Sequence, residues 1–147
     1  MFLSKEIFSL VVQNTPLISI DLLVQNEKQE ILLGKRVNEP ASNFWFVPGG
    51  RIFKDESLDA AFTRTVQEEL GLGMQRSEAL FDKTYEHFYE NNVFSDAFST
   101  HYIVLAHKIK IDTLPILNTQ HSQYRWFDIE ELLSNERVHN YTKDYFR

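Results

Sequence analysis

The chain has 147 residues, and 43% of them are hydrophobic, which fits one domain with a sizeable core and excludes a disordered chain. The absence of cysteine excludes a disulfide scaffold, a thiolate nucleophile and a Cys-zinc site. A net charge of -6 argues against binding nucleic acid through its phosphates, and no apolar run reaches the length of a membrane span. Because Lys5 and Glu6 interrupt the place of a signal peptide's apolar region, we expect a cytoplasmic protein.

The first half of the chain alternates short apolar runs with turn residues. Ser4 is a suitable cap for a short helix to about Val12, and Pro16 would end it. Asn26 to Gln29 is typical of a turn between two strands, and Pro48-Gly49-Gly50 of the end of a third. The strands expected here are Leu17–Val24, Ile31–Gly34 and Phe44–Val47.

The second half adds the best-defined helix, which Ser57 opens and Gly71 stops after Leu70. Residues from Ser99 to Ile111 alternate clearly between two sets, as in a strand with two different faces. The other elements expected are strands Leu80–His87 and Gln123–Phe127 and a helix from Asp128 to Leu133. Mixed strands and helices in one repeat-free chain predict a single α+β domain over residues 1–147.

The helix after Gly49-Gly50 carries an unusual carboxylate. At about 100° per residue, Glu69 falls on the same stripe as Phe62 and Val66, and a core-facing carboxylate is costly unless it is paired or binds a metal. Carboxylates near a Gly-Gly turn make an oxygen-rich site suited to Mg²⁺. The alternative is a surface helix with ordinary ion pairs between residues four positions apart.

The spacing of these residues resembles the Nudix box, G-x5-E-x7-R-E-U-x-E-E-x-G-U, in which U is a bulky apolar residue. The matching positions are Gly50, Glu56, Arg64, Val66, Glu68, Glu69, Gly71 and Leu72. The resemblance implies an α/β/α sandwich around a central mixed β-sheet, with a loop-helix-loop that holds a divalent metal against a diphosphate.

Thr65 departs from this pattern, because it stands where the box has a Glu after the Arg. A hydroxyl cannot replace a charged Mg²⁺ ligand with comparable strength. We therefore expect a weaker multi-metal site or a single ion with another role, the alternative being a neutral replacement.

Outside the box, the chain resembles one Nudix branch, the GDP-mannose mannosyl hydrolases, which also lack that Glu. The matching segments are Met1-Phe2-Leu3-Ser4, Thr15-Pro16-Leu17, Leu32–Arg36, Trp45–Arg51, Glu86–Tyr89, Thr100-His101-Tyr102, Gln120-His121 and Tyr124-Arg125-Trp126. The resemblance implies hydrolysis of GDP-mannose, and possible use of GDP-glucose, to GDP and the free sugar. Water would attack the anomeric carbon with inversion.

The resemblance also implies the residue roles. The metal ligands would be the Gly49 carbonyl and the side chains of Glu69 and Gln120, with Mg²⁺ or Mn²⁺ as the ion, and His121 would be the general base. Arg36 would act on the leaving diphosphate, with Arg51 and Tyr102 nearby. The nucleotide contacts would be Phe2, Leu3 and Phe8. The N-terminal segment, residues 1–15, would reach a second subunit of a homodimer.

Several single residues keep two interpretations. Asp21 interrupts an apolar strand and is either a buried hydrogen-bond partner or a sugar contact. His87 is either a group near the sugar or a structural histidine. Arg64 is expected to pair with the box carboxylates rather than with substrate. Two other functions stay open: a Nudix diphosphatase that makes GMP and a sugar phosphate, which Glu68 would favour, and a non-catalytic nucleotide-sugar sensor.

Overall fold

The computed structural model describes residues 2–94, 97–112 and 121–147, with the backbone alone at 121 and 122. In chain order the elements are α1 (Lys5–Asn14), β1 (Leu17–Gln25), β2 (Ile31–Arg36), β3 (Trp45–Phe46), β4 (Gly49–Arg51), α2 (Leu58–Leu70), the 3₁₀ helix η1 (Arg76–Glu78), β5 (Leu80–Tyr89), β6 (Thr100–Lys110), β7 (His121–Phe127), α3 (Ile129–Ser134) and α4 (Asn140–Asp144).

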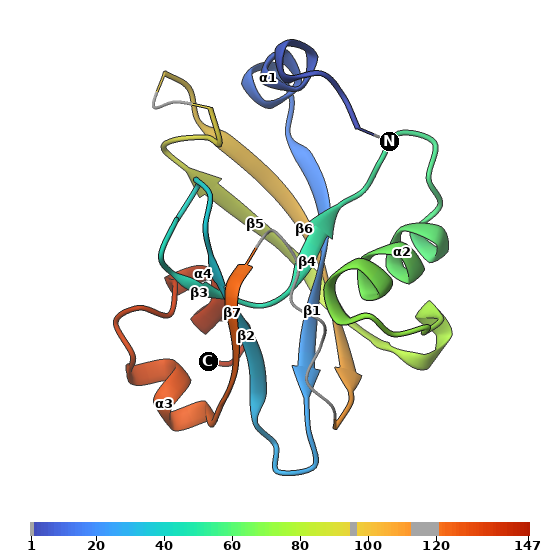
Figure 1. The fold of residues 1–147 in the computed structure, drawn as a ribbon, viewed down its shortest axis with the longest axis vertical. Helices are drawn as coiled ribbons and strands as arrows, with labels where there is room; N and C mark the ends of the chain where they lie inside the picture. Colours follow the sequence, from blue (N-terminus) through green and yellow to red (C-terminus); the bar gives the residue numbers. More distant parts are fainter. Residues whose placement is uncertain (1, 95–96, 113–120) are drawn as a thin grey trace.

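The strands form one mixed sheet with helices on both of its faces (Figure 1). Its main order is β3-β2-β1-β6-β5, while β4 pairs with β1 and β7 pairs with β2. The β1 and β6 strands run parallel, and the other pairs are antiparallel. Helix α2 covers one face, and α3 and α4 cover the other (Figure 1). The expected α+β sandwich with a central mixed sheet is confirmed.

The central strand β1 contributes side chains to the hydrophobic cores on both faces of the sheet, because its side chains alternate between the two faces. Ile20, Leu22 and Val24 are fully buried against the α2 side. Leu23 points the other way, into the core shared with α3 and α4. Asp21 has the same parity as Leu23, so it falls on the α4 side of the sheet.

The helix boundaries follow the predicted caps. The Ser4 and Ser57 side chains accept hydrogen bonds from the third residue after each of them, at the start of α1 and α2. Gly71 ends α2 in the left-handed conformation, with φ at 67°. Asp128 caps α3 in the same way as the two serines.

Three short elements escape the sequence prediction, and the 3₁₀ helix η1 is one of them. Strand β4 covers the Gly49-Gly50 turn, which was expected only to end a strand, and it pairs with β1 over Ser19 to Asp21. Helix α4 has only five residues, too few for a recognisable hydrophobic period. The β7 strand begins at His121, two residues earlier than expected, because it continues to pair with β2 as far as Arg36.

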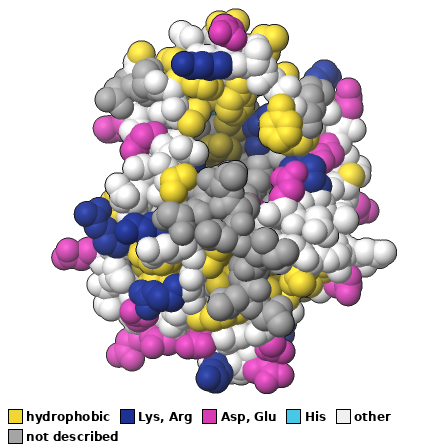
Figure 2. Space-filling view, viewed as in Figure 1, with side chains coloured by type: hydrophobic (Ala, Val, Ile, Leu, Met, Phe, Trp, Pro, Cys, Tyr) yellow, Lys and Arg dark blue, Asp and Glu magenta, His cyan; other side chains and the backbone are white. Residues whose placement is uncertain are grey.

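The N-terminal helix α1 rests on the sheet end through the buried Val12, while Ile7 and Leu10 remain exposed. Figure 2 shows hydrophobic side chains gathered around this helix, at the top of the view. In the described part of the chain, no helix has the length and apolar character needed to cross a membrane.

Replacing Gly71 by Ala should destabilise the protein by about 1–2 kcal/mol, because a Cβ disfavours the left-handed backbone that ends α2. Gly73→Ala is the matched control, since a Cβ there meets no atom within 4 Å. Urea unfolding curves of both variants measure the difference, and equal unfolding free energies would contradict the role of Gly71.

Candidate active site

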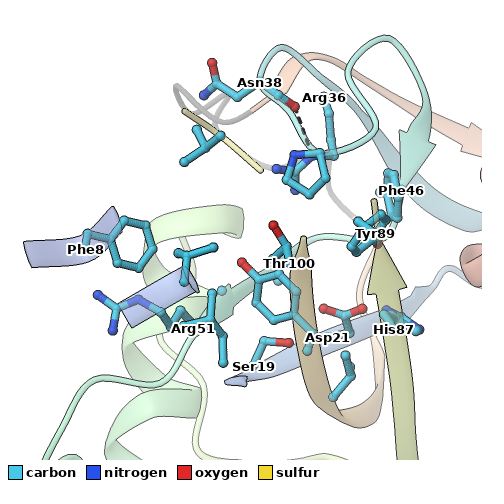
Figure 3. A pocket seen from close by; sticks show the side chains of 18 of the residues that line it. Phe8, Ser19, Asp21, Arg36, Asn38, Phe46, Arg51, His87, Tyr89 and Thr100 are labelled. Carbon is cyan, nitrogen blue, oxygen red and sulfur yellow. Dashed lines mark hydrogen bonds between the residues drawn. The ribbon is translucent and has the colours of Figure 1, made fainter. Parts of the chain in front are cut away.

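A cavity of about 640 Å³ opens beside β1, between α1 and the strands that flank it. Its size is in the usual range for small-molecule sites. In Figure 3, Phe8 and Arg51 lie at one side of it, and Phe46, Tyr89 and His87 at the other. The wall therefore has an end rich in phenylalanine and arginine and a second end of mixed aromatic and polar groups.

Strand β4 brings the predicted metal ligands Gly49 and Glu69 together. The Glu69 side chain is only 3% exposed, and its Oε1 accepts a hydrogen bond from the Gly49 N–H at 3.3 Å. On its other side, Gly49 pairs with Asp21 of β1. A Cβ on Gly49 would overlap the Asp21 carboxyl group and lie 2.6 Å from the Ile20 carbonyl oxygen, so this close approach requires glycine.

Arg64 binds the other two carboxylates of the box. Its guanidinium donates two hydrogen bonds to Glu56, of 2.6 and 2.9 Å, and one to Glu68, of 3.1 Å. It also donates to the Arg51 carbonyl at 2.8 Å and lies 3.8 Å from the centre of the Phe53 ring. The expectation that Arg64 pairs with the box carboxylates is confirmed, and the Glu56 pKa is lowered mainly by this hydrogen-bonded arginine.

Thr65 is buried under β4, with its side chain close to Gly50. A Cβ on Gly50 would lie 3.4 Å from the Thr65 hydroxyl oxygen, which has no hydrogen-bond partner among the described residues. Thr65 does not line the cavity. The residue that departs from the box thus adds no charge to the site.

Asp21 is a buried hydrogen-bond partner, as one of its two interpretations expected, and it is also part of the cavity wall, while the sugar contact stays a prediction. Its Oδ2 accepts a short hydrogen bond from the Tyr145 hydroxyl, and its side chain lines the cavity. Burial raises the Asp21 pKa to about 7, against the opposing effects of Tyr145 and Arg36. This carboxyl group changes charge near neutral pH.

Arg36 and Arg51 both line the cavity, and both influence the pKa of Tyr102. Burial raises the pKa of Tyr102, whereas the positive charges of Arg36 and Arg51 lower it. Burial also lowers the pKa of Arg51, and its guanidinium lies 4.9 Å from the ring centres of both Phe8 and Phe53. The structure therefore brings these three predicted residues together, with two cations available for an anionic ligand.

The predicted nucleotide contacts Phe2, Leu3 and Phe8 line the same cavity at its phenylalanine-rich end. The Phe2 ring is 6.1 Å from that of Phe53, and 93% of Phe2 is exposed. The exposed Phe2 ring, next to the Phe53 ring on which Arg51 lies, offers a stacking surface for a flat ligand.

His87 lies at the opposite end of the cavity and is almost fully buried. Burial lowers its pKa to about 4, so the ring is neutral at physiological pH. Its Nε2 has no hydrogen-bond partner among the described residues, and Tyr141 stacks on the ring at 4.2 Å. A neutral ring with an unpartnered nitrogen at the cavity wall is suited to hydrogen bonding with a ligand hydroxyl.

The last two predicted site residues are Gln120 and His121. Gln120 lies outside the described residues, and His121 is described by its backbone alone. That backbone pairs with Arg36 across β2 and β7, so the expected base and the expected diphosphate ligand are neighbours on adjacent strands.

Sequence reasoning did not single out Tyr89, which lines the cavity between Phe46 and His87 (Figure 3). It also missed Tyr141, which stacks on His87, and Tyr145, which donates a hydrogen bond to Asp21. No local signal marks them, because their roles depend on where α4 packs. Trp45 and Phe46 of the expected strand Phe44–Val47 are buried, and Phe46 also meets the cavity.

The comparisons with known proteins decide the family. The sequence profile of the NUDIX domain matches residues 15–146. The chain belongs to this family. It is 41% identical over 119 residues to the low-salt glycan biosynthesis protein Agl8 of Haloferax volcanii, which covers 80% of this chain and 74% of that protein. We therefore describe it as a Nudix hydrolase.

Solved Nudix structures share the fold. The MutT protein of Methanosarcina mazei Go1 superimposes with a TM-score of 0.70 at 27% identity, over 90% of this chain and 92% of that one. The MutT Nudix hydrolase of Burkholderia pseudomallei gives a TM-score of 0.71 at 21% identity, over 89% and 95% of the two chains.

Nudix hydrolases generally use divalent metal ions such as Mg²⁺ or Mn²⁺. The buried Glu69 carboxylate, which accepts from the Gly49 N–H, offers a hard oxygen of the kind such ions require. Within the described residues, no three His, Asp or Glu side chains are grouped as a metal site. A cation at Glu69 thus needs further donors, and the Gly49 carbonyl and an amide oxygen such as that of Gln120 are suitable types.

Glu56→Gln should destabilise the protein by about 1–3 kcal/mol at neutral pH, because Arg64 loses one of its two charged partners. The folded-state pKa of Glu56 is depressed, so its contribution is present above the unfolded pKa of about 4.3 and disappears as the pH falls through the lower folded value. The gap between wild type and Glu56→Gln should therefore narrow on acidification.

Urea unfolding at several pH values measures this gap. The exposed Asp55→Asn is the matched control, since its contact with Lys54 is a surface pair of 3.7 Å that should contribute little. A gap that stays constant down to the acid limit of folding would show that the Glu56–Arg64 charge pairing is not the cause.

Proposed function

We propose that this Nudix hydrolase cleaves GDP-mannose, with GDP-glucose as a second substrate, to GDP and the free sugar by water attack at the anomeric carbon with inversion. One observation carries the proposal: Arg64 is hydrogen-bonded to Glu56 and Glu68, and Thr65 stands where the box has a Glu, so the box brings one carboxylate fewer to a cavity whose wall includes Glu69. Such a site suits one cation better than the carboxylate clusters used for attack at phosphorus. The likeness to a glycan biosynthesis protein is consistent with a nucleotide-sugar substrate.

The departing diphosphate is the first requirement of this reaction. Breaking a glycosidic C–O bond builds positive character at the anomeric carbon and negative charge on the leaving oxygen. When bound through Gly49, Glu69 and Gln120, Mg²⁺ or Mn²⁺ would supply positive charge to that diphosphate. Arg36 and Arg51 would add two permanent cations, because guanidinium groups hold phosphate oxygens in pairs.

The second requirement is an activated water beside the sugar. His121 would serve as the general base, since an imidazole is often neutral at working pH and accepts a proton readily. One base is sufficient because a neutralised diphosphate leaves without a proton donor. The backbone pairing of His121 with Arg36 supports this arrangement, since base and leaving-group ligand sit on neighbouring strands.

The two ends of the cavity support the orientation of the substrate. The guanine would stack near Phe2, Leu3 and Phe8, next to the Arg51 guanidinium. The mannose would lie at the opposite end, where Asp21 and the neutral His87 offer hydrogen-bond partners for its hydroxyl groups.

We further propose that residues 1–147 act as one domain in a cytoplasmic homodimer. The apolar side chains that α1 leaves exposed, Ile7 and Leu10, support a role of residues 1–15 at the subunit interface.

Two other functions compete with this proposal. A Nudix diphosphatase would release GMP and a sugar 1-phosphate, and the presence of Glu68 at the cavity wall favours it. A nucleotide-sugar sensor would bind without turnover at any Mg²⁺ concentration.

Hydrolysis of GDP-mannose in ¹⁸O-water tests the proposal directly. The label should enter the mannose, and the first sugar released should have the inverted anomeric configuration. Mass spectrometry and NMR of the products make the measurement. Label in a phosphate would establish the diphosphatase reaction, and binding without any product would establish the sensor.

His121→Ala should lower kcat by about 10²–10⁴-fold, the usual contribution of a general base. His101→Ala is a suitable control, because His101 stacks on Phe88 and does not line the cavity. Steady-state kinetics with GDP-mannose compare the two variants, and a loss below about tenfold for His121→Ala would assign the base to another residue.

A further inference from the structure

Residues 139–145, here called the backing segment, lie behind the sugar end of the cavity. The segment comprises His139 and helix α4 with its end residue Tyr145. It packs on the face of the sheet that carries Asp21, and none of its residues lines the cavity itself. Three of its aromatic rings nevertheless contact residues of the cavity wall, a different one each.

Tyr145 contacts Asp21. The Tyr145 hydroxyl donates a short hydrogen bond to Oδ2 of Asp21, across 124 positions of the sequence. The other oxygen, Oδ1, is the atom nearest to a Cβ built on Gly49, so it faces strand β4. The hydrogen bond from Tyr145 thus holds Oδ2 in place, and this fixes the direction in which Oδ1 points.

Tyr141 contacts His87. The two rings stack at 4.2 Å with an angle of 12° between their planes. The Tyr141 hydroxyl accepts from the Phe88 N–H at 2.9 Å and donates to the Phe88 carbonyl at 2.8 Å. Both bonds tie this ring to β5 next to His87, so the imidazole cannot rotate freely.

His139 contacts Phe46. The rings stack at 4.7 Å, and the Arg36 guanidinium lies 5.7 Å from the centre of the same Phe46 ring. The Nδ1 of His139 accepts from the Tyr141 N–H at 3.1 Å, which links the two supporting rings within the segment.

We propose that the backing segment positions the sugar-binding groups, with Tyr145 as the positioning residue that orients the Asp21 carboxyl group toward the substrate. This inference rests on the proposed function, because it assigns the Asp21 and His87 end of the cavity to the sugar. Tyr145 is buried, yet its hydroxyl makes a polar contact to the cavity residue Asp21, and Tyr141 makes two hydrogen bonds to Phe88, next to His87. The chemistry of the backing segment therefore determines how well the sugar is held.

Tyr145→Phe tests the proposal, since it removes the hydroxyl and keeps the ring. The expected result is a fall of about 10- to 100-fold in kcat/KM for GDP-mannose, the usual effect of leaving a buried polar group without its hydrogen-bond partner. The inhibition constant of GDP, which has no sugar, should change less than about twofold.

Tyr85→Phe is the matched control. The Tyr85 hydroxyl also donates to an aspartate, Asp82, at 2.8 Å, and its ring meets that of Tyr145 at 4.6 Å. Tyr85 neither contacts Asp21 nor lines the cavity. The Tyr85→Phe variant should therefore have the kcat/KM and the GDP inhibition constant of the wild type. Thermal melting of the two variants shows whether a loss of activity comes from a loss of folding or from a loss of positioning.

A double-mutant cycle with Asp21→Ala tests whether Tyr145 acts through Asp21. In the Asp21→Ala background, Tyr145→Phe should have no further effect on kcat/KM. An undiminished second loss, an equal loss of GDP affinity, or a Tyr145→Phe enzyme within about twofold of wild type would each overturn the proposal.

For each variant in the cycle, the rate at which GDP-mannose is consumed is measured. The products are identified in a separate experiment. If phosphorus is attacked, the proposed reaction fails while the Tyr145–Asp21 coupling is still measured. If the wild type binds GDP-mannose without turnover, the same cycle is read from its affinity by calorimetry. A wild type that neither consumes nor binds GDP-mannose would overturn both proposals.

Discussion

The close approach of strand β4 to β1 at Gly49 is the constraint on which the site depends. A side chain at this position would overlap the Asp21 carboxyl group, so the two strands pair only because the residue is glycine. The same backbone donates to the buried Glu69, which attaches helix α2 to the strand. One tight contact therefore brings the Nudix helix, the central strand and the cavity wall together.

Charge is divided between two groups of arginines around this contact. Arg64 is committed to the box, where Glu56 and Glu68 balance it and hold the loop before α2 against the helix. Arg36 and Arg51 face the cavity instead, without an ion pair to an acidic side chain among the described residues. The fold thus stabilises its loop with one arginine and presents two others to an anionic ligand.

Local patterns predict the elements that have strong local causes. The helix from Ser57 to Gly71 was predicted residue by residue, because a cap, a hydrophobic period and a left-handed glycine all agree. The β4 strand was missed, since its pairing depends on β1 and a Gly-Gly pair disfavours strands in isolation. Helix α4 was missed because five residues carry too short a pattern.

The sequence by itself determined the family, the box residues and the identity of the departing position, Thr65, because these depend on residue type and spacing along the chain. The tertiary structure alone decided that Asp21 meets Tyr145 and that His87 lies against Tyr141. Such contacts join residues far apart in the chain, and their geometry comes from how α4 and α2 pack on opposite faces of the sheet.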